Sequence, residues 1–295
     1  MACSSRRGVT HASPSSPPDS PMILVNGIAT DEVSALDRGL SYGDGLFETV
    51  AVVAGEILNW PRHVARLHDG CNRLAIPQPD AGQLSEEVRT VAAGTDRSIV
   101  KITITRGAGG NGYTPPTEIT PTRIVAPRPW PKHYAEREQQ GIRICVAQHR
   151  LSSNPRLAGL KHLNRLDQVL ASVELMTRDA TEALMLDHGG RVIEATRCNL
   201  FAVYGTHLST PRLTICGVSG VMRAVIAQLA PALGLAFAET ALTLDDIRAA
   251  DEVFLCNAIA GIWPVIELDD GPLRTYSIGE HTRRLQAALI AGHHH

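Results

Sequence analysis

The apolar and polar positions of this chain predict strands and helices that alternate along nearly its whole length. Residues 46–53 are apolar and β-branched, the pair at 54–55 is a turn, and residues 56–60 return as a second strand, so this stretch predicts a hairpin. A helix then begins at Pro61, the position where a helix tolerates proline. Its apolar face repeats at helical spacing, through Val64, Leu67, Cys71 and Leu74.

The remaining periodic segments lie on either side of a proline-rich stretch. Further strands are predicted at residues 98–105, 122–126, 142–148, 182–186, 192–194, 200–203 and 252–256, and further helices at 83–93, from about 162 to 178, from 221 and after 277. The fold class is therefore predicted as α/β, with a small α+β domain followed by a larger mixed α/β domain.

Changes in composition mark the predicted boundaries of these domains. A stretch rich in Ser and Pro precedes Met22, after which a strand at 23–25 and an Asn26-Gly27 turn begin the folded part. Three prolines within 127–131 remove backbone donors, so this stretch predicts a linker rather than a helix or a central strand. The predicted units are a disordered leader at 1–21, a small domain at 22–126, the linker at 127–131, a large domain at 132–292 and a tag remnant at 293–295.

Charge and cysteine content narrow the class of function. A formal net charge of −2 from well-mixed acids and bases provides no field that attracts nucleic acid or an anionic membrane. No apolar run reaches the ~18 residues that span a bilayer. The six cysteines are scattered, with no pair at metal-ligand spacing, which predicts reduced thiols in the cytoplasm and no metal site. The composition therefore favours an enzyme that acts on a small molecule.

A glycine-rich loop has the spacing of a dinucleotide-binding motif. Gly107, Gly109 and Gly112 follow a predicted strand, as that motif requires. The prolines at 115–116 forbid the helix that such a loop must open, so the motif is rejected. A flexible loop near a ligand and a plain structural turn both stay open.

Lys161 is the best candidate for an amine nucleophile. It is one of only three lysines, and it lies between the apolar residues 157–160 and the start of a predicted helix. Burial and the positive end of the helix would both favour the neutral amine, which Schiff-base chemistry needs. A solvated surface lysine is the commoner case, so position alone does not decide.

Three motifs in order give this chain a family resemblance. They are SYGDGLFET at 41–49, PRHVARL at 61–67 and NPRLAGLKHLNRL at 154–166. The last closely resembles the cofactor-lysine segment of 4-amino-4-deoxychorismate lyases, which are fold-type IV pyridoxal-phosphate enzymes similar to branched-chain and D-amino-acid aminotransferases. The resemblance extends from Asn26 to about Pro264. It implies that the chain has this fold and carries pyridoxal 5'-phosphate on Lys161.

The resemblance also implies which residues bind the phosphate of the cofactor. Arg66 would bind it through the planar donor fork of its guanidinium, although by pattern alone it is a solvated arginine on a helix face. The segment GVSGVMR at 217–223 would present backbone N–H groups at a helix start, which involves Ser219, Val221 and Met222. Ser219 as a plain helix cap is compatible with that role. Met222 stands where related aminotransferases have threonine, so a hydroxyl contact is absent.

The resemblance assigns three further positions around the cofactor and suggests two for the substrate. Glu194 would pair with the pyridine nitrogen, and Asn199 and Asn257 match other cofactor positions. The plain alternatives are the end of a hairpin strand for Glu194 and turn residues for the asparagines. Arg106 and Tyr113, which flank the glycine loop, are predicted ligands of the substrate carboxylates.

The function that the resemblance implies is conversion of 4-amino-4-deoxychorismate to p-aminobenzoate and pyruvate, a step of folate biosynthesis, in which Lys161 removes the ring proton. Two rivals stay open: an aminotransferase of D- or branched-chain amino acids with the same fold, and a non-catalytic protein that binds pyridoxal phosphate. The residues at 161–166 favour the lyase. The predicted partners are the small-molecule substrate, a second copy of the chain in a homodimer, and aminodeoxychorismate synthase in a transient contact.

Overall fold

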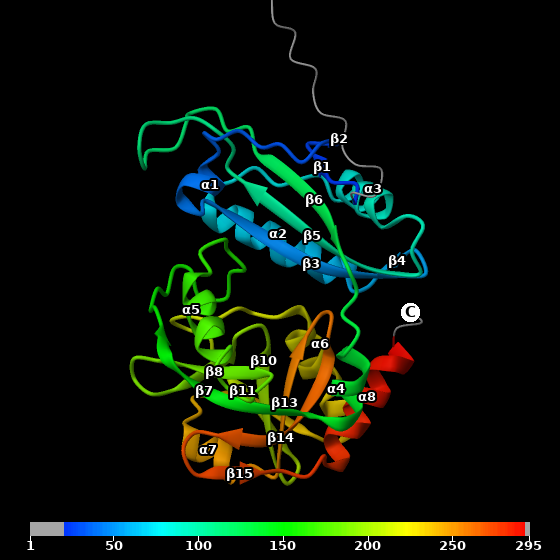
Figure 1. Ribbon diagram of the computed structural model, residues 1–295, viewed down its shortest axis with the longest axis vertical. Helices are drawn as coiled ribbons and strands as arrows, with labels where there is room; N and C mark the ends of the chain where they lie inside the picture. The colour runs from blue at the N-terminus through cyan, green and yellow to red at the C-terminus, as the bar shows by residue number, and fades with distance from the viewer. Residues whose placement is uncertain (1–20, 293–295) are drawn as a thin grey trace, which may run out of the picture.

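The computed structural model describes residues 21–292, which form two β-sheets with helices packed against them (Figure 1). The predicted tag remnant and the predicted leader, apart from its last residue, lie outside the described residues. No helix within residues 21–292 is long and apolar enough to cross a membrane. The α/β fold class predicted from the sequence is confirmed.

The first sheet has six antiparallel strands in the order β2-β1-β6-β5-β3-β4, and it occupies the upper half of Figure 1. Its strands are β1 (Leu24–Val25), β2 (Ile28–Ala29), β3 (Gly45–Val53), β4 (Glu56–Ile57), β5 (Arg97–Thr105) and β6 (Thr122–Arg128). The helices of this half are α1 (Arg38–Tyr42), α2 (Trp60–Leu74) and α3 (Ala81–Ala92). Helix α2 packs on β3, and α3 packs on β5 and β6.

The second sheet has nine strands in the order β12-β11-β10-β13-β14-β7-β8-β9, with β15 paired to β14. It mixes parallel and antiparallel neighbours. Its strands are β7 (Ile142–Leu151), β8 (Glu182–Asp187), β9 (Val192–Ala195), β10 (Asn199–Tyr204), β11 (His207–Pro211), β12 (Ala236–Thr240), β13 (Glu252–Asn257), β14 (Gly261–Asp269) and β15 (Leu273–Thr275). Its helices are α4 (Tyr134–Gln140), α5 (Leu166–Leu175), α6 (Val221–Leu229), α7 (Leu244–Ala249) and α8 (Glu280–Gly292), with a 3-10 turn at Pro231–Leu233.

Strand β3 separates a core from a cavity. Leu46 and Val50 are buried in the core cluster that also contains Leu67 of α2. Burial of one such side chain stabilises the fold by roughly 1.5–3 kcal/mol, so this face fixes the register of the strand. Phe47 and Thr49 lie on the opposite face and are only half-buried, because successive side chains of a strand point to opposite sides. That second face is available to a ligand.

The predicted linker begins too early by two residues. Strand β6 continues to Arg128, and Pro127 pairs with Val100 of β5. The proline is tolerated because β1 pairs β6 only at Ile124 and Val125, so β6 is an edge strand at Pro127 and its missing N–H faces no partner strand. The division into two domains stays a prediction, and the two sheets support a linker at 129–133 instead.

Helix α5 is shorter than predicted, because the residues before it pair with the first sheet. The main-chain N–H of Phe47 donates to the carbonyl of Lys161 at 2.9 Å, and Leu163 N–H donates to the carbonyl of Gly45 at 3.0 Å. These bonds hold residues 161–163 extended against β3, so the helix begins only at Leu166. The predicted contribution of a helix end to the Lys161 amine is therefore wrong.

Candidate active site

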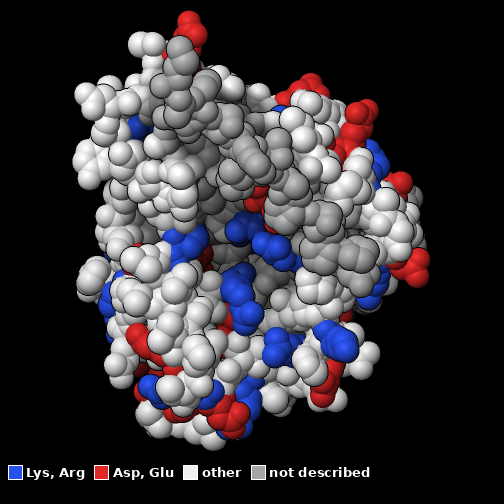
Figure 2. Space-filling model, turned by 45° about the horizontal axis from the view of Figure 1, so that its top comes forward, with Lys and Arg blue, Asp and Glu red and all other residues white. Residues whose placement is uncertain are grey.

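A cavity of about 360 Å³ lies between the two sheets. Its walls come from β3, from α2, and from segments of the second half at 194–199, 218–221 and 257–259. The charged side chains of the wall are four cations against one acid, namely Arg66, Lys161, Arg165 and Arg197 against Glu194. On the face shown in Figure 2, Lys and Arg side chains gather around a central hollow. This charge distribution suits an anionic ligand.

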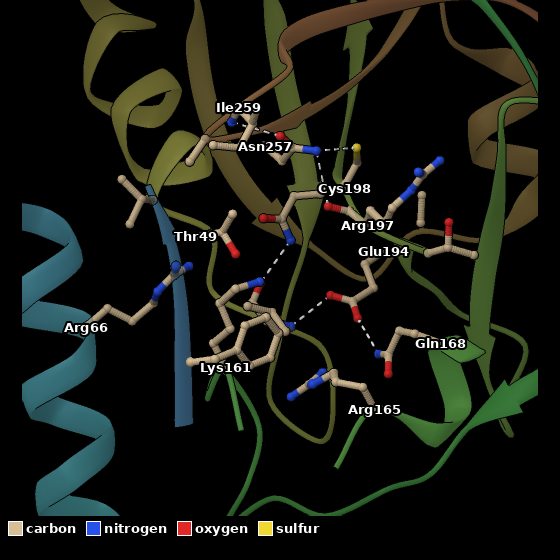
Figure 3. Close-up of a pocket in the computed structure, with 18 of the residues that line it drawn as sticks. Thr49, Arg66, Lys161, Arg165, Gln168, Glu194, Arg197, Cys198, Asn257 and Ile259 are labelled. Atoms are coloured by element: carbon tan, nitrogen blue, oxygen red, sulfur yellow. Dashed lines mark hydrogen bonds between the residues drawn. The ribbon is translucent and has the colours of Figure 1, made fainter. Parts of the chain in front are cut away.

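The Lys161 side chain lies in the wall of this cavity, between Arg66 and Glu194 (Figure 3). Its Nζ is 4.3 Å from the centre of the Phe47 ring. Burial, and to a lesser degree the positive charge of Arg66, lower the pKa of the amine to about 8. At a pKa of about 8, about one amine in ten is neutral at pH 7, compared with about one in three thousand for an ordinary lysine. The prediction that burial favours the neutral amine of Lys161 agrees with this geometry.

Glu194 is the acidic residue of the cavity wall. It lies on β9, and its carboxylate accepts a hydrogen bond from Val218 N–H at 2.8 Å and another from the Gln168 amide at 3.0 Å. Burial raises the pKa of Glu194 despite these two donors. A cation that reaches this carboxylate would stabilise its ionised form, so the site can hold a protonated ring nitrogen.

Arg66 is held in a fixed orientation by a buried carboxylate. Glu48, on β3, accepts hydrogen bonds from Arg66 Nε at 2.8 Å and Nη2 at 2.5 Å. His63 Nδ1 lies 2.7 Å from the same carboxylate. Burial alone would raise the pKa of Glu48, but the charge of Arg66 and the hydrogen bonds from His63 and Arg66 hold it at about 2. Arg66 Nη1 also donates to the carbonyl of Ser219, which joins α2 to the start of α6.

The start of α6 forms the wall on the Arg66 side of the cavity. The helix begins at Val221, so its first backbone N–H groups have no preceding helical carbonyl to donate to. Gly220 must be glycine, because a Cβ there would come within 2.0 Å of Asn199 Oδ1. Ser219 contributes its carbonyl to Arg66, whereas the Met222 side chain is buried in the core under β13. Only the backbone of Met222 is therefore placed to meet an anion.

The two asparagines line the cavity and also shape its loops. Asn199 donates from Nδ2 to the carbonyl of Val218 at 2.8 Å. Asn257 accepts hydrogen bonds from the N–H groups of Ile259 and Ala260 at 2.9 and 2.7 Å. The turn interpretation therefore holds for Asn257, and its position in the wall leaves contact with a cofactor as a prediction.

Arg106 and Tyr113 are not brought to this cavity. Arg106 donates to the Asp44 carboxylate from Nε at 2.8 Å and from Nη2 at 3.1 Å, and its remaining bonds go to the carbonyls of Leu74 and Ala75. Tyr113 is 87% exposed and packs its ring against Tyr42. The donors of Arg106 are thus used within its own half of the molecule, which gives no support to its predicted role as a carboxylate ligand.

Most residues of the wall were not predicted from the sequence, and three of them have polar side chains of interest: Thr49, Arg165 and Gln168. Thr49 carries a signal that could have identified it, because it is two residues after Phe47 on a strand and so shares its face. Arg165 belongs to the segment 161–166 that favours the lyase, but its place in the wall, like that of Gln168, depends on where α5 begins and could not be predicted.

Comparison with solved structures places both sheets of the described chain in one known fold. The structure of 4-amino-4-deoxychorismate lyase from Pseudomonas aeruginosa superposes with a TM-score of 0.86 at 44% identity, over 92% of this chain and 98% of that one. Branched-chain amino acid aminotransferase from Escherichia coli superposes with a TM-score of 0.84 at 27% identity, over 92% and 94% of the two chains. The fold is therefore the fold-type IV aminotransferase fold predicted from the motifs.

Curated relatives agree with the structural comparison. The aminodeoxychorismate lyase of Vibrio harveyi is 35% identical over 269 residues, which covers 91% of this chain and 99% of that protein. A putative branched-chain-amino-acid aminotransferase of Methanocaldococcus jannaschii is 34% identical over 275 residues, which covers 90% and 93%. Residues 45–268 match the amino-transferase class IV family, and this chain belongs to that family.

Proposed function

We propose that this chain is a pyridoxal-phosphate-dependent lyase that converts 4-amino-4-deoxychorismate to p-aminobenzoate and pyruvate. The observation that carries the proposal is the Lys161 amine, which lies in the cavity between the guanidinium of Arg66 and the carboxylate of Glu194. Its pKa of about 8 makes the neutral, nucleophilic form accessible near neutral pH.

The residues of the cavity fit pyridoxal phosphate at both ends. Arg66 and the N–H groups at the start of α6 offer donors to a phosphate, and the Gly220 position leaves no room for a side chain beside Asn199. At the other end, Glu194 is a buried carboxylate that would take the charge of a pyridinium. Solved relatives from Mycobacterium tuberculosis with this fold contain the same cofactor or its amino form.

When bound, pyridoxal phosphate supplies an electron sink for the bonds that break in the substrate. The side chains of this protein then have separate tasks. Arg66 would hold the phosphate, Glu194 would hold the ring nitrogen protonated, and Lys161 would anchor the cofactor. As a neutral base, the Lys161 amine would remove the proton from the ring carbon of the substrate that bears nitrogen, a step that positioned bases accelerate by ~10²–10⁴.

Aminotransferase activity is the second candidate, because the family contains both reactions and the relative from M. jannaschii is nearly as similar as the lyase. The lyase is favoured by the greater identity to the P. aeruginosa lyase than to the E. coli aminotransferase. The segment LKHLNRL at 160–166, which surrounds the cofactor lysine, favours the lyase as well.

The decisive experiment supplies the unstable substrate in place. Purified protein is mixed with aminodeoxychorismate synthase, chorismate and glutamine, and p-aminobenzoate and pyruvate are quantified. Equimolar products that depend on the added protein are expected. A protein loaded with cofactor that forms neither product, yet transfers amino groups from D- or branched-chain amino acids to a keto acid, would instead be the aminotransferase.

The proposal includes a homodimer, supported by an exposed apolar face on α5. Leu166, Val169, Val173 and Met176 recur on that face and are 69, 52, 57 and 84% exposed. Light scattering during size-exclusion chromatography is expected to give twice the mass of one chain for the wild type and less for Val173→Glu. If Val173→Glu still has the mass of a dimer, this face of α5 is not part of the dimer interface.

A cytoplasmic location, a place in folate biosynthesis and a transient contact with the synthase complete the proposal. The five described cysteines are free and buried, which suits a reducing compartment. Restoration of p-aminobenzoate-independent growth to a lyase-deficient bacterium would support the pathway. Faster product formation with the synthase than with substrate supplied at the same measured concentration would support the contact.

A further inference from the structure

Arg165 is a cation of the cavity wall that the mechanism above does not use. It immediately precedes α5, and in Figure 3 its side chain lies close to Lys161. Nε donates to the carbonyl of His162 at 2.8 Å, and Nη2 donates to the carbonyl of Leu160 at 3.0 Å. Both acceptors are uncharged, and both belong to the residues that flank the cofactor lysine.

The other two arginines of the wall are paired with carboxylates. Arg66 lies 2.5 Å from Glu48, and Arg197 lies 2.7 Å from Glu182. In residues 21–292, Arg165 has no carboxylate within ion-pair distance. Burial lowers the pKa of Arg165 more than the negative charges near it raise it, which is the direction expected of a half-buried cation without an ion-pair partner. Removing such a charge from water costs free energy unless an anionic ligand pairs with it.

The geometry of the guanidinium defines the missing ligand. Nε and one Nη2 hydrogen form one edge of the planar group, and the loop carbonyls occupy that edge. The opposite edge, formed by Nη1 and the second Nη2 hydrogen, makes no hydrogen bond within the described chain. Two parallel N–H donors in one plane match the two oxygens of a carboxylate. The cofactor phosphate is not the natural ligand, because Arg66 and α6 already provide its donors.

We propose that Arg165, rather than Arg106, binds a carboxylate of the substrate. This assignment rests on the proposed function, since it takes the substrate to be an anionic amine. The carboxylate belongs either to the ring, which p-aminobenzoate retains, or to the enolpyruvyl group, which pyruvate retains. Held by the carbonyls on both sides of Lys161, Arg165 aligns the substrate with the amine that removes its proton.

The test measures binding and not turnover. Protein loaded with pyridoxal phosphate is titrated with p-aminobenzoate and with pyruvate by calorimetry, for the wild type, Arg165→Gln and Arg165→Lys. Loss of a bidentate charged contact is expected to raise the Kd of one of the two anions by about ten- to a hundredfold in Arg165→Gln. Arg165→Lys, which keeps the charge without the fork, should give an intermediate value. The anion that is weakened identifies the carboxylate.

Matched controls exclude a general effect of charge. Arg62→Gln removes a charge one turn before Arg66, from a half-buried side chain that contacts Gln228 outside the cavity, and should leave both Kd values unchanged. p-Aminobenzamide, which lacks the carboxylate, should bind the wild type and Arg165→Gln equally. The proposal is overturned if both anions bind Arg165→Gln and Arg165→Lys with the Kd values of the wild type. It is also overturned if Arg165→Gln binds pyridoxal phosphate more weakly but, once loaded, binds both anions normally.

Failure of the proposed function would look different. A wild type that makes no p-aminobenzoate in the lyase assay, yet loses anion affinity on Arg165→Gln, would keep the carboxylate site and refute the lyase. A wild type that is an active lyase, with Arg165→Gln unchanged in anion affinity and in KM, would refute only the site.

Discussion

The two ends of the cavity manage charge in opposite ways. At the Arg66 end, the cation is paired with the buried Glu48, whose pKa is held at about 2, and the group is tied to α6 through Ser219. At the Lys161 end, burial moves the pKa of Lys161 down and that of Glu194 up, so both groups lie nearer to their neutral forms.

Arg66 and Glu48 thus keep their charges, whereas Lys161 and Glu194 can gain or lose a proton when a ligand binds. A phosphate anchor works best with a permanent charge in a fixed orientation, which a buried carboxylate provides. A base and a ring-nitrogen partner work best when their proton can move, which incomplete pairing provides. The following predictions test whether the two ends behave in these different ways.

The largest effect is expected at Lys161. Lys161→Ala removes the anchor of the cofactor and the base together, so p-aminobenzoate formation should fall by at least about 10³–10⁴. Lys132→Ala, an exposed lysine in the segment between the sheets, is the control and should keep wild-type turnover. Turnover by Lys161→Ala within tenfold of the wild type would show that the amine has no chemical role.

The next effect is expected at Glu194. Glu194→Gln removes the negative charge that keeps a ring nitrogen protonated, so turnover should fall by about 10² while cofactor affinity changes less. The measurement is single-turnover product formation together with cofactor titration. Glu280→Gln, on an exposed residue at the start of α8, should leave both quantities unchanged. Glu194→Gln could instead bind the cofactor weakly but turn over normally at saturating cofactor. In that case Glu194 would serve only to bind the cofactor, as Arg66 does.

Glu48→Gln should produce a smaller change in binding and a measurable loss of stability. Arg66 would lose its buried partner, so we expect cofactor Kd to rise by about tenfold and the free energy of unfolding at pH 7 to fall by about 3 kcal/mol. Urea denaturation measures the second quantity, and Glu86→Gln on an exposed position of α3 is the control.

The pH dependence of that loss has a defined direction. The pKa of Glu48 is about 2 in the folded chain and near its ordinary value of 4.5 in the unfolded chain. Its contribution is therefore complete above pH 4.5 and is lost as the pH falls towards 2. The stability difference between the wild type and Glu48→Gln should shrink over this window. A difference that stays constant from pH 7 to pH 3 would mean that the Glu48 charge is not stabilising.

The smallest effect concerns the rate at which cofactor-free protein takes up pyridoxal phosphate. Because the neutral amine reacts, the rate of covalent attachment should rise about tenfold per pH unit below pH 8 and level off above it. Stopped-flow absorbance of the bound cofactor measures this rate. An inflection near pH 10 would show that Lys161 is an ordinary lysine before the cofactor binds.

Local patterns predicted the elements that bury one apolar face. The hairpin of β3 and β4 and the helix α2 follow from residues close together in sequence, and both form, although the strand predicted at 56–60 ends at Ile57 and α2 already begins at Trp60. The Asn26-Gly27 turn also forms, with both residues at positive φ. Arg66, Lys161 and Glu194, which the family resemblance assigned to the cofactor, line one cavity, and their roles there stay predictions.

Features that depend on long-range contacts were not accessible to these patterns. The helical periodicity before Leu166 is overridden by hydrogen bonds to β3, which is more than a hundred residues earlier in the chain. Arg106 looked available because its partner Asp44 is distant in sequence. Arg165 was overlooked for the converse reason, since an arginine is distinctive only when the structure shows that it lacks a carboxylate.

The bonds between residues 161–163 and β3 have a consequence for hybrid proteins. Lys161 is encoded in the second half of the chain, but its backbone is attached to the first sheet, while Gly159 is bonded to Gly217 and Ser219 in the second half. A chimaera whose first sheet comes from an aminotransferase would thus change the strand to which the Lys161 backbone is hydrogen-bonded. The lysine and its neighbours in sequence would stay the same. Recombination within this family can therefore shift the position of the Lys161 amine by changing only the sequence of the first sheet.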